Sequence, residues 1–121
     1  MEITNIQQGD IFLARLNPNQ GQEVGKIRPV ILYTATPLIP RLSIVTIIPL
    51  TSQFRPNLTA FRIPITKRDR LLIPSYAMIE HIRSIDKQRI NFNQRLTRLS
   101  PLENYQIQQQ LKVFLNLTPF D

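Results

Sequence analysis

The chain of 121 residues contains no cysteine, no tryptophan and one histidine. Without cysteine it can form neither a disulfide framework nor a thiolate metal site. A single histidine leaves carboxylates as the main possible ligands, so we expect no metal centre. The longest apolar run, residues 44–50, is too short to span a membrane, and the N-terminus lacks a signal-peptide pattern. These absences predict a soluble cytoplasmic protein.

Acidic residues are also scarce, with 8 Asp and Glu against 15 Lys and Arg and a net charge of +7. Residues 55–98 hold ten basic and three acidic residues and so account for the whole net charge. Eleven of the fifteen cations are arginine, which makes two-pronged phosphate contacts better than lysine does. This pattern predicts a polyanionic partner, most commonly nucleic acid. A generally basic, solvated surface is the plainer alternative.

The length suits one domain, which we expect to comprise residues 1–121. Before residue 100 the chain consists of short β-rich segments between proline and glycine turns. The predicted strands cover residues 11–16, 29–34, 43–48, 60–66 and 76–86, the last with a bend. The third of these is nearly all apolar, which indicates burial on both faces. Pro64 favours an edge position for the fourth.

A helix is predicted to begin at Ser100, because proline follows at the first helical position and Glu103 can close a capping box. Apolar residues then recur at helical spacing and predict one stripe facing the core: Ile107, Leu111, Phe114 and Leu115. The predicted fold class is therefore mainly β with a C-terminal helix. A small, partly open antiparallel barrel is the simplest arrangement.

A shaped loop is expected ahead of the second strand. Gly21 and Gly25 can both adopt positive φ, Glu23 between them supplies a carboxylate, and Arg28 precedes Pro29, which biases it to an extended conformation. The two glycines lack the Lys-Ser/Thr ending of a phosphate-binding loop, and we predict no cofactor. A turn with a surface ion pair is the plain interpretation.

Polar and charged residues gather at the expected strand ends: Glu23, Arg28, Thr51, Ser52, Gln53, Glu80, His81 and Arg83. Such a set can cleave RNA without a metal, because the attacking 2′-hydroxyl belongs to the substrate. The protein has only to accept a proton, neutralise the charge growing on the phosphoryl oxygens and help the 5′-oxygen leave. Glu80 and His81 are adjacent, so on a strand they would point to opposite faces.

Several short motifs, in their order and spacing, resemble the MazF/PemK (Kid) toxins. They are Gly9-Asp10-Ile11, Asn17-Pro18, Gly21-x-Glu23, Arg28-Pro29, Pro49-Leu50-Thr51-Ser52-Gln53, Ile82-Arg83-Ser84-Ile85-Asp86-Lys87, Arg95-Leu96 and Leu99-Ser100-x-x-Glu103. The resemblance implies a type II toxin with an SH3-like barrel that acts as a homodimer. It also implies a metal-independent, sequence-specific endoribonuclease that cuts single-stranded RNA, including mRNA, leaves a 2′,3′-cyclic phosphate and is covered by a cognate antitoxin.

The same resemblance makes Arg28 and Thr51 the principal catalytic pair, with Glu23 in the adjacent loop. Glu23 and Glu80 both remain candidates for the general base. Met78 stands where some members carry a catalytic arginine, so that version of the mechanism is not available to this chain. The residues expected to bind RNA are Ser52, Gln53, Arg55, Glu80, His81 and Arg83.

Two other functions stay open at the level of sequence. One is a non-catalytic relative with the same barrel that acts by binding a protein, as the CcdB gyrase poisons do. The other is a basic SH3-like module that binds RNA or DNA without chemistry. Phe54 and Phe61 could stack on the bases of a bound nucleic acid, or they could belong to the core.

Overall fold

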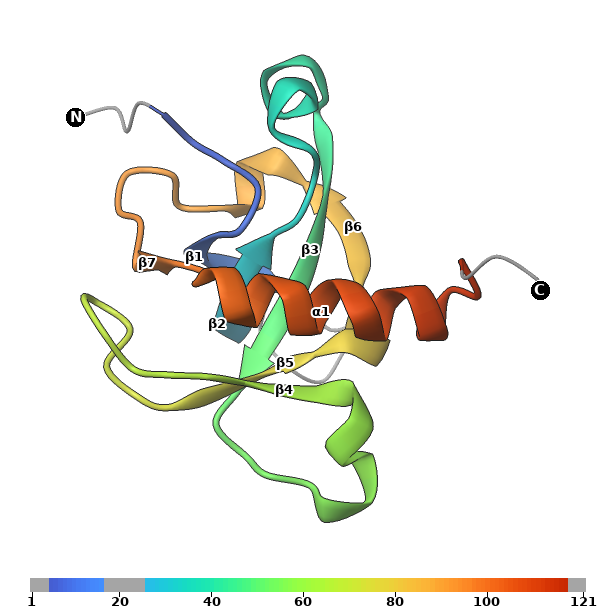
Figure 1. Cartoon of the computed structure of the whole chain (residues 1–121). Helices are drawn as coiled ribbons and strands as arrows, with labels where there is room; N and C mark the ends of the chain where they lie inside the picture. Colours follow the sequence, from blue (N-terminus) through green and yellow to red (C-terminus); the bar gives the residue numbers. More distant parts are fainter. Residues whose placement is uncertain (1–4, 17–25, 118–121) are drawn as a thin grey trace.

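A computed structural model describes residues 5–16 and 26–117 of the chain. Its strands and helix are β1 (Asp10–Leu16), β2 (Lys26–Leu32), β3 (Ile44–Thr51), β4 (Arg62–Ile65), β5 (Ser75–Met78), β6 (Arg83–Asp86), β7 (Thr97–Arg98) and α1 (Pro101–Phe114) (Figure 1). Four short 3-10 helices connect them: η1 (Thr36–Arg41), η2 (Pro56–Phe61), η3 (Ile79–His81) and η4 (Lys87–Arg89). Within these described ranges no helix is both long and apolar enough to cross a membrane.

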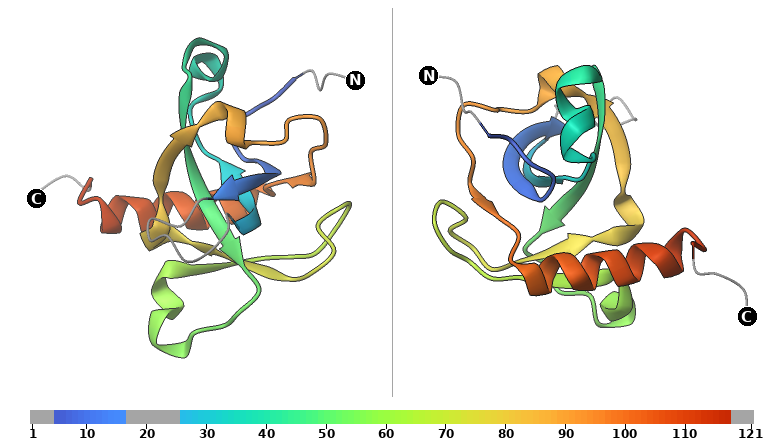
Figure 2. Two further views of the ribbon diagram at one scale, coloured as in Figure 1. Left: turned by 180° about the vertical axis from the view of Figure 1, so that it is seen from behind. Right: turned by 45° about the horizontal axis from the view of Figure 1, so that its top comes forward.

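The strands form one antiparallel sheet in the order β4-β5-β3-β2-β1-β7, and β6 pairs with β3 off this path. One edge of β3 pairs with β2 through residues 47–49, and its other edge exchanges partners, from β6 at residues 44–47 to β5 at residues 50–51. Because of this exchange the sheet curls into a half-barrel, with α1 lying across it (Figures 1 and 2). The predicted fold class is therefore confirmed, and β4 with Pro64 is an edge strand as expected.

The core lies on both sides of β3. Ile47 is completely buried in one apolar cluster with Phe12, and the next residue, Ile48, is completely buried in another with Ile107 of α1. Successive strand residues point to opposite faces, so two clusters need an uninterrupted apolar run. Burial on both faces is confirmed, except that Ile44 at the start of β3 is 49% exposed.

Two strand boundaries were wrong by three residues each. β2 begins at Lys26 instead of Pro29, because residues 26–28 pair with β1 in a continuous register that ends at Leu16 opposite Lys26. β3 continues through Pro49 to Thr51. Pro49 lies between the part of β3 that pairs with β6 and the part that pairs with β5. A residue without a backbone donor is tolerated at such a gap in the ladder.

Helix α1 begins as predicted, with Ser100 as N-cap and Glu103 closing the capping box. Ile107 and Leu111 are buried, but Phe114 and Leu115 are 41% and 46% exposed, so the predicted stripe was wrong in its last turn. The C-terminal end of α1 projects beyond the strands in all the views of Figures 1 and 2. The end of the helix therefore has less of the sheet to pack against.

The turn before β1 depends on glycine. Gly9 has a φ of 98°, a conformation that side chains with a Cβ rarely adopt. The following residue, Asp10, is completely buried. Its carboxylate accepts hydrogen bonds from the backbone amide of Gln7 and from the Arg98 guanidinium. This contact with Asp10 raises the pKa of Arg98. The Gly9-Asp10 motif thus ties β1 to β7.

Candidate active site

A cleft of about 930 Å³ opens where the start of β2, the end of β3, the loop of residues 66–74 and η3 meet. The predicted site residues that the structure describes all line it: Arg28, Thr51, Ser52, Gln53, Arg55, Glu80, His81 and Arg83. They come from three separate stretches of the chain: β2, the end of β3 with the segment after it, and η3 with the start of β6. Glu23, the third predicted catalytic residue, lies outside the described residues.

Arg28 and Thr51 are brought together by strand register. β2 and β3 are antiparallel, with Val30 opposite Pro49. The pairing ends there, and two residues further along each strand are Arg28 and Thr51, which both line the cleft. The Arg28 guanidinium donates a hydrogen bond from Nη1 to the Leu50 carbonyl at 3.1 Å, which orients it beside the end of β3.

The segment that follows β3 is organised by side-chain hydrogen bonds. The backbone amide of Gln53 donates to Thr51 Oγ1 at 3.2 Å, and Arg55 Nη2 donates to the side-chain oxygen Oε1 of Gln53 at 3.1 Å. Because the Thr51 oxygen accepts the bond from Gln53, its hydroxyl proton can be donated to another group. Ser52, Gln53 and Arg55 are all exposed along the cleft.

Arg62 is a functional candidate that sequence reasoning missed. Its side chain leaves β4 opposite Met78 of β5, is only 6% exposed and forms an ion pair with Glu80. Within the part of the chain that the structure describes, the buried atoms Arg62 Nε and Glu80 Oε1 have no hydrogen-bond partner. Arg62 also lines the cleft, so β4 supplies a guanidinium there from the position paired with Met78. Only the β4–β5 register reveals this, because the two residues are far apart in sequence.

The expected separation of Glu80 and His81 was wrong. Both lie in the 3-10 helix η3 instead of a strand, and His81 Nε2 is 3.8 Å from Glu80 Oε2. Adjacent residues of such a turn do not alternate between two faces as strand residues do. Both side chains line the cleft, and His81 is 56% exposed there.

The cleft is strongly cationic. Among the described residues, one carboxylate lines it, Glu80, against six cationic side chains: Lys26, Arg28, Arg55, Arg62, Arg70 and Arg83. A concave surface of one charge sign raises the local concentration of an oppositely charged ligand. Within residues 5–16 and 26–117 no group of three or more His, Cys, Asp and Glu side chains is placed to hold a metal ion.

Two aromatic residues considered for base stacking have different surroundings. Phe61 packs against the apolar cluster that contains Ile48, and its ring lies 6.0 Å from that of Phe114. Phe54 is 52% exposed, and its ring lies 5.5 Å from that of Tyr76. Phe61 is thus a partly buried residue packed against the core, whereas Phe54 remains available at the surface.

The sequence and the fold both match known proteins. The family described as PemK-like, MazF-like toxin of type II toxin-antitoxin system matches residues 7–115. The chain is 31% identical over 120 residues to Endoribonuclease MazF of Staphylococcus epidermidis, covering 96% of both chains.

Solved structures share the fold. The MazE-MazF structure from Deinococcus radiodurans has a TM-score of 0.76 and 16% identity, covering 93% of this chain and 97% of that one. An endoribonuclease in complex with its cognate antitoxin, from a Mycobacterial species, has a TM-score of 0.72 and 16% identity, covering 97% and 100%. Taken with the sequence matches, these findings show that the chain belongs to the family of PemK-like, MazF-like toxins of type II toxin–antitoxin systems.

Proposed function

We propose that this toxin is a metal-independent, sequence-specific endoribonuclease that cuts single-stranded RNA, including mRNA. The observation that carries the proposal is the convergence of Arg28, Thr51 and a cationic lining in one cleft. Membership of the family and 31% identity to a protein named as an endoribonuclease support it.

In the proposed reaction the RNA supplies its own nucleophile. A carboxylate accepts the proton of a 2′-hydroxyl, whose oxygen attacks the neighbouring phosphorus. Arg28 stabilises the negative charge that grows on the phosphoryl oxygens. Thr51 donates a hydrogen bond to the same group. The bond from phosphorus to the 5′-oxygen then breaks and that oxygen takes up a proton, leaving a 2′,3′-cyclic phosphate and a 5′-hydroxyl end.

Two carboxylates are candidates for accepting the proton. Glu80 lines the cleft and is oriented by Arg62. Glu23 lies outside the described residues, in the segment just before β2. Comparing the pH–rate profiles of Glu23→Gln and Glu80→Gln distinguishes them, since loss of the general base removes the acidic limb of the profile. Ser52, Gln53, Arg55, His81 and Arg83 are proposed to bind the RNA on either side of the cut.

We further propose that residues 1–121 act as one domain, that the active form is a homodimer and that a cognate antitoxin covers the cleft. The proposed partners follow the family resemblance, and the Mycobacterial relative is itself described in complex with its cognate antitoxin. The proposed location is the cytoplasm, where mRNA is available. Light scattering of the purified protein tests the dimer directly.

The function is tested by incubating the protein with a long single-stranded RNA and mapping the cut ends. We expect cuts at a defined sequence, cyclic phosphate ends, and no cut where the 2′-hydroxyl before the scissile phosphate is replaced by hydrogen. RNA binding without any product would instead favour a non-catalytic nucleic-acid-binding module. Neither binding nor cleavage would favour a CcdB-like toxin that acts by binding a protein.

A further inference from the structure

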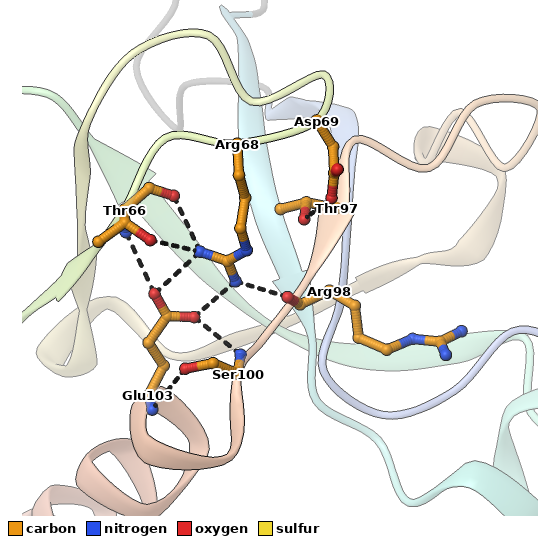
Figure 3. Close-up of polar contacts among 7 residues, drawn as sticks. All are labelled: Thr66, Arg68, Asp69, Thr97, Arg98, Ser100 and Glu103. Atoms are coloured by element: carbon orange, nitrogen blue, oxygen red, sulfur yellow. Dashed lines mark hydrogen bonds and ion pairs between the residues drawn. The ribbon is translucent and has the colours of Figure 1, made fainter.

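The loop of residues 66–74 joins β4 to β5 and takes part in two separate surfaces. Residues 70–73 line the cleft. On its other side, Arg68 reaches across to the N-terminus of α1 and contacts Glu103 (Figure 3). We refer to the hydrogen-bonded group of Thr66, Arg68, Ser100 and Glu103 as the clamp.

Arg68 uses both ends of its guanidinium in the clamp. Nη1 donates to Glu103 Oε2 at 3.0 Å and to the Thr66 hydroxyl at 2.8 Å. Nη2 donates to Glu103 Oε1 at 2.7 Å and also to the Arg98 carbonyl of β7. Such a two-pronged contact between an arginine and a carboxylate fixes orientation as well as distance. The loop is thereby joined to both α1 and β7.

Glu103 is the centre of the clamp. It is only 6% exposed and accepts hydrogen bonds from the Thr66 amide at 3.1 Å and the Ser100 amide at 2.9 Å. Burial disfavours its charge, but the hydrogen bonds from Arg68, Ser100 and Thr66 outweigh burial and lower the pKa of Glu103. The carboxylate therefore serves the helix cap and the loop at once.

Two further bonds fix the chain at Asp69 and at Arg70. The Thr97 hydroxyl donates to Asp69 Oδ2 at 2.6 Å, and the Arg70 amide donates to the Leu96 carbonyl at 2.9 Å. Figure 3 shows Asp69 and Thr97 meeting beside the clamp. Arg70 itself is exposed and lines the cleft. The backbone at Arg70 is thus fixed by hydrogen bonds, while its side chain lines the cleft.

We propose that the clamp is a positioning device for RNA: it holds the loop of residues 66–74 so that Arg70 meets the phosphate backbone in the cleft. Arg68 and Glu103 are then positioning residues that act through Arg70 and make no contact with RNA. This inference rests on the proposed endoribonuclease function. The alternative is that the clamp stabilises the fold and has no influence on the substrate.

The test compares Arg68→Lys, Glu103→Gln and Arg70→Met with the wild type. Lysine cannot reproduce the two-pronged contact. Glutamine can still close the capping box, so Glu103→Gln keeps the start of α1 if Arg68→Lys fails to fold. Arg41→Met is the matched control, because Arg41 lies exposed in η1, away from the cleft. Binding is measured with a labelled 2′-O-methyl RNA that carries the mapped cut sequence and cannot be cut, and cleavage with the unmodified RNA of the same sequence.

We expect each clamp variant to weaken RNA binding about five- to tenfold and to raise KM with little change in kcat, since the catalytic groups stay in place. The log–log salt slope should become less negative by about 0.7, the loss of one phosphate contact on a single strand. In the Arg70→Met background, adding Arg68→Lys or Glu103→Gln should weaken binding no further. Arg41→Met should leave KM unchanged.

Additive effects of the clamp variants and Arg70→Met, or a fall in kcat at unchanged KM, would overturn the inference while leaving the endoribonuclease function standing. A lowered melting temperature with wild-type KM would also overturn it, because the clamp would then be structural only. A wild-type protein that neither binds nor cuts RNA would overturn the proposed function and this inference with it.

Discussion

At the scale of single residues, Arg28 is the group whose surroundings bear most directly on the proposed reaction. Its guanidinium is half-buried at the start of β2, donates to the Leu50 carbonyl and lines the cleft beside the end of β3. A donor already held in place loses no reorganisation energy when charge develops on a substrate. Its position suits transition-state stabilisation better than general attraction of RNA.

Arg28→Ala is therefore expected to lower the rate of cleavage by about 10²–10³-fold, the usual cost of removing one preorganised donor. RNA binding and the melting temperature should change little, because five other described cations remain in the cleft. Single-turnover cleavage and binding assays measure the two effects separately. Arg28→Lys should rescue poorly, since a point charge lacks the planar two-pronged contact.

Arg41→Ala provides the control for the loss of one positive charge outside the cleft and should cleave at the wild-type rate. Cleavage by Arg28→Ala at near wild-type rate would contradict the assignment of Arg28.

A second prediction for a single residue concerns Glu103 and the pH dependence of stability. Its pKa in the folded protein lies below the ordinary value of 4.5. Its charged form therefore contributes stability that is fully present above about pH 4.5 and is lost as the pH falls through the folded pKa. Urea unfolding between pH 7 and pH 3 should show a steeper acid loss of stability for the wild type than for Glu103→Gln. Parallel curves for the two proteins would contradict this.

At the scale of elements, α1 is fastened to the barrel mainly by its first three turns. Ile107 is completely buried and Leu111 is 8% exposed, whereas Leu115 beyond the helix end is 46% exposed. Leu111→Ala should lower the free energy of unfolding by about 2–5 kcal/mol, the range for truncating a buried leucine. Leu115→Ala should cost less than about 1 kcal/mol. Equal losses in denaturant unfolding would show that the helix packs differently.

Strand β3 shows how one element organises the site. Its apolar residues supply both core clusters, its middle pairs with β2, and its end carries Thr51 into the cleft. The same strand therefore sets the fold and the site. Changes in its register would move Thr51 relative to Arg28, since a slip of one residue sends every side chain to the opposite face.

At the scale of the whole molecule, positive charge is concentrated where the substrate is proposed to bind. Four of the cations lining the cleft come from residues 55–98, the stretch that holds the whole net charge. Neutralising about three to five phosphates would release as many counterions. The expected log–log slope of RNA affinity against salt is then about −2 to −3.5. If fluorescence titrations show an RNA affinity that does not change with salt, the basic stretch is only a solvated surface.

The reaction as a whole should not need a divalent cation. The cleft offers guanidinium groups that can neutralise phosphoryl charge, and the nucleophile is a hydroxyl of the RNA itself. Cleavage is therefore expected to persist in excess EDTA, with Mg²⁺ having only a general ionic-strength effect. Loss of activity on chelation that Mg²⁺ restores would point to a different, metal-assisted mechanism.

The sequence alone determined the features that depend on neighbouring residues or on periodicity. The capping box at Ser100 and Glu103 is local, because its two hydrogen bonds join residues three apart. The burial of β3 on both faces follows from an apolar run. The short motifs between Gly9 and Glu103, taken together, indicated the family, and eight of the nine predicted site residues line one cleft.

Tertiary structure decided whatever depends on which strands become neighbours. Arg62 lies 18 positions before Glu80, and no periodicity links them; they meet because the β4–β5 register pairs Arg62 with Met78, two residues before Glu80. The exposure of Phe114 and Leu115 depends on how far α1 extends past the sheet, which helical spacing does not encode. Arg68 and Glu103, 35 positions apart, meet because the loop after β4 folds onto the start of α1. Long-range pairing is the physical reason that these contacts are absent from any local pattern.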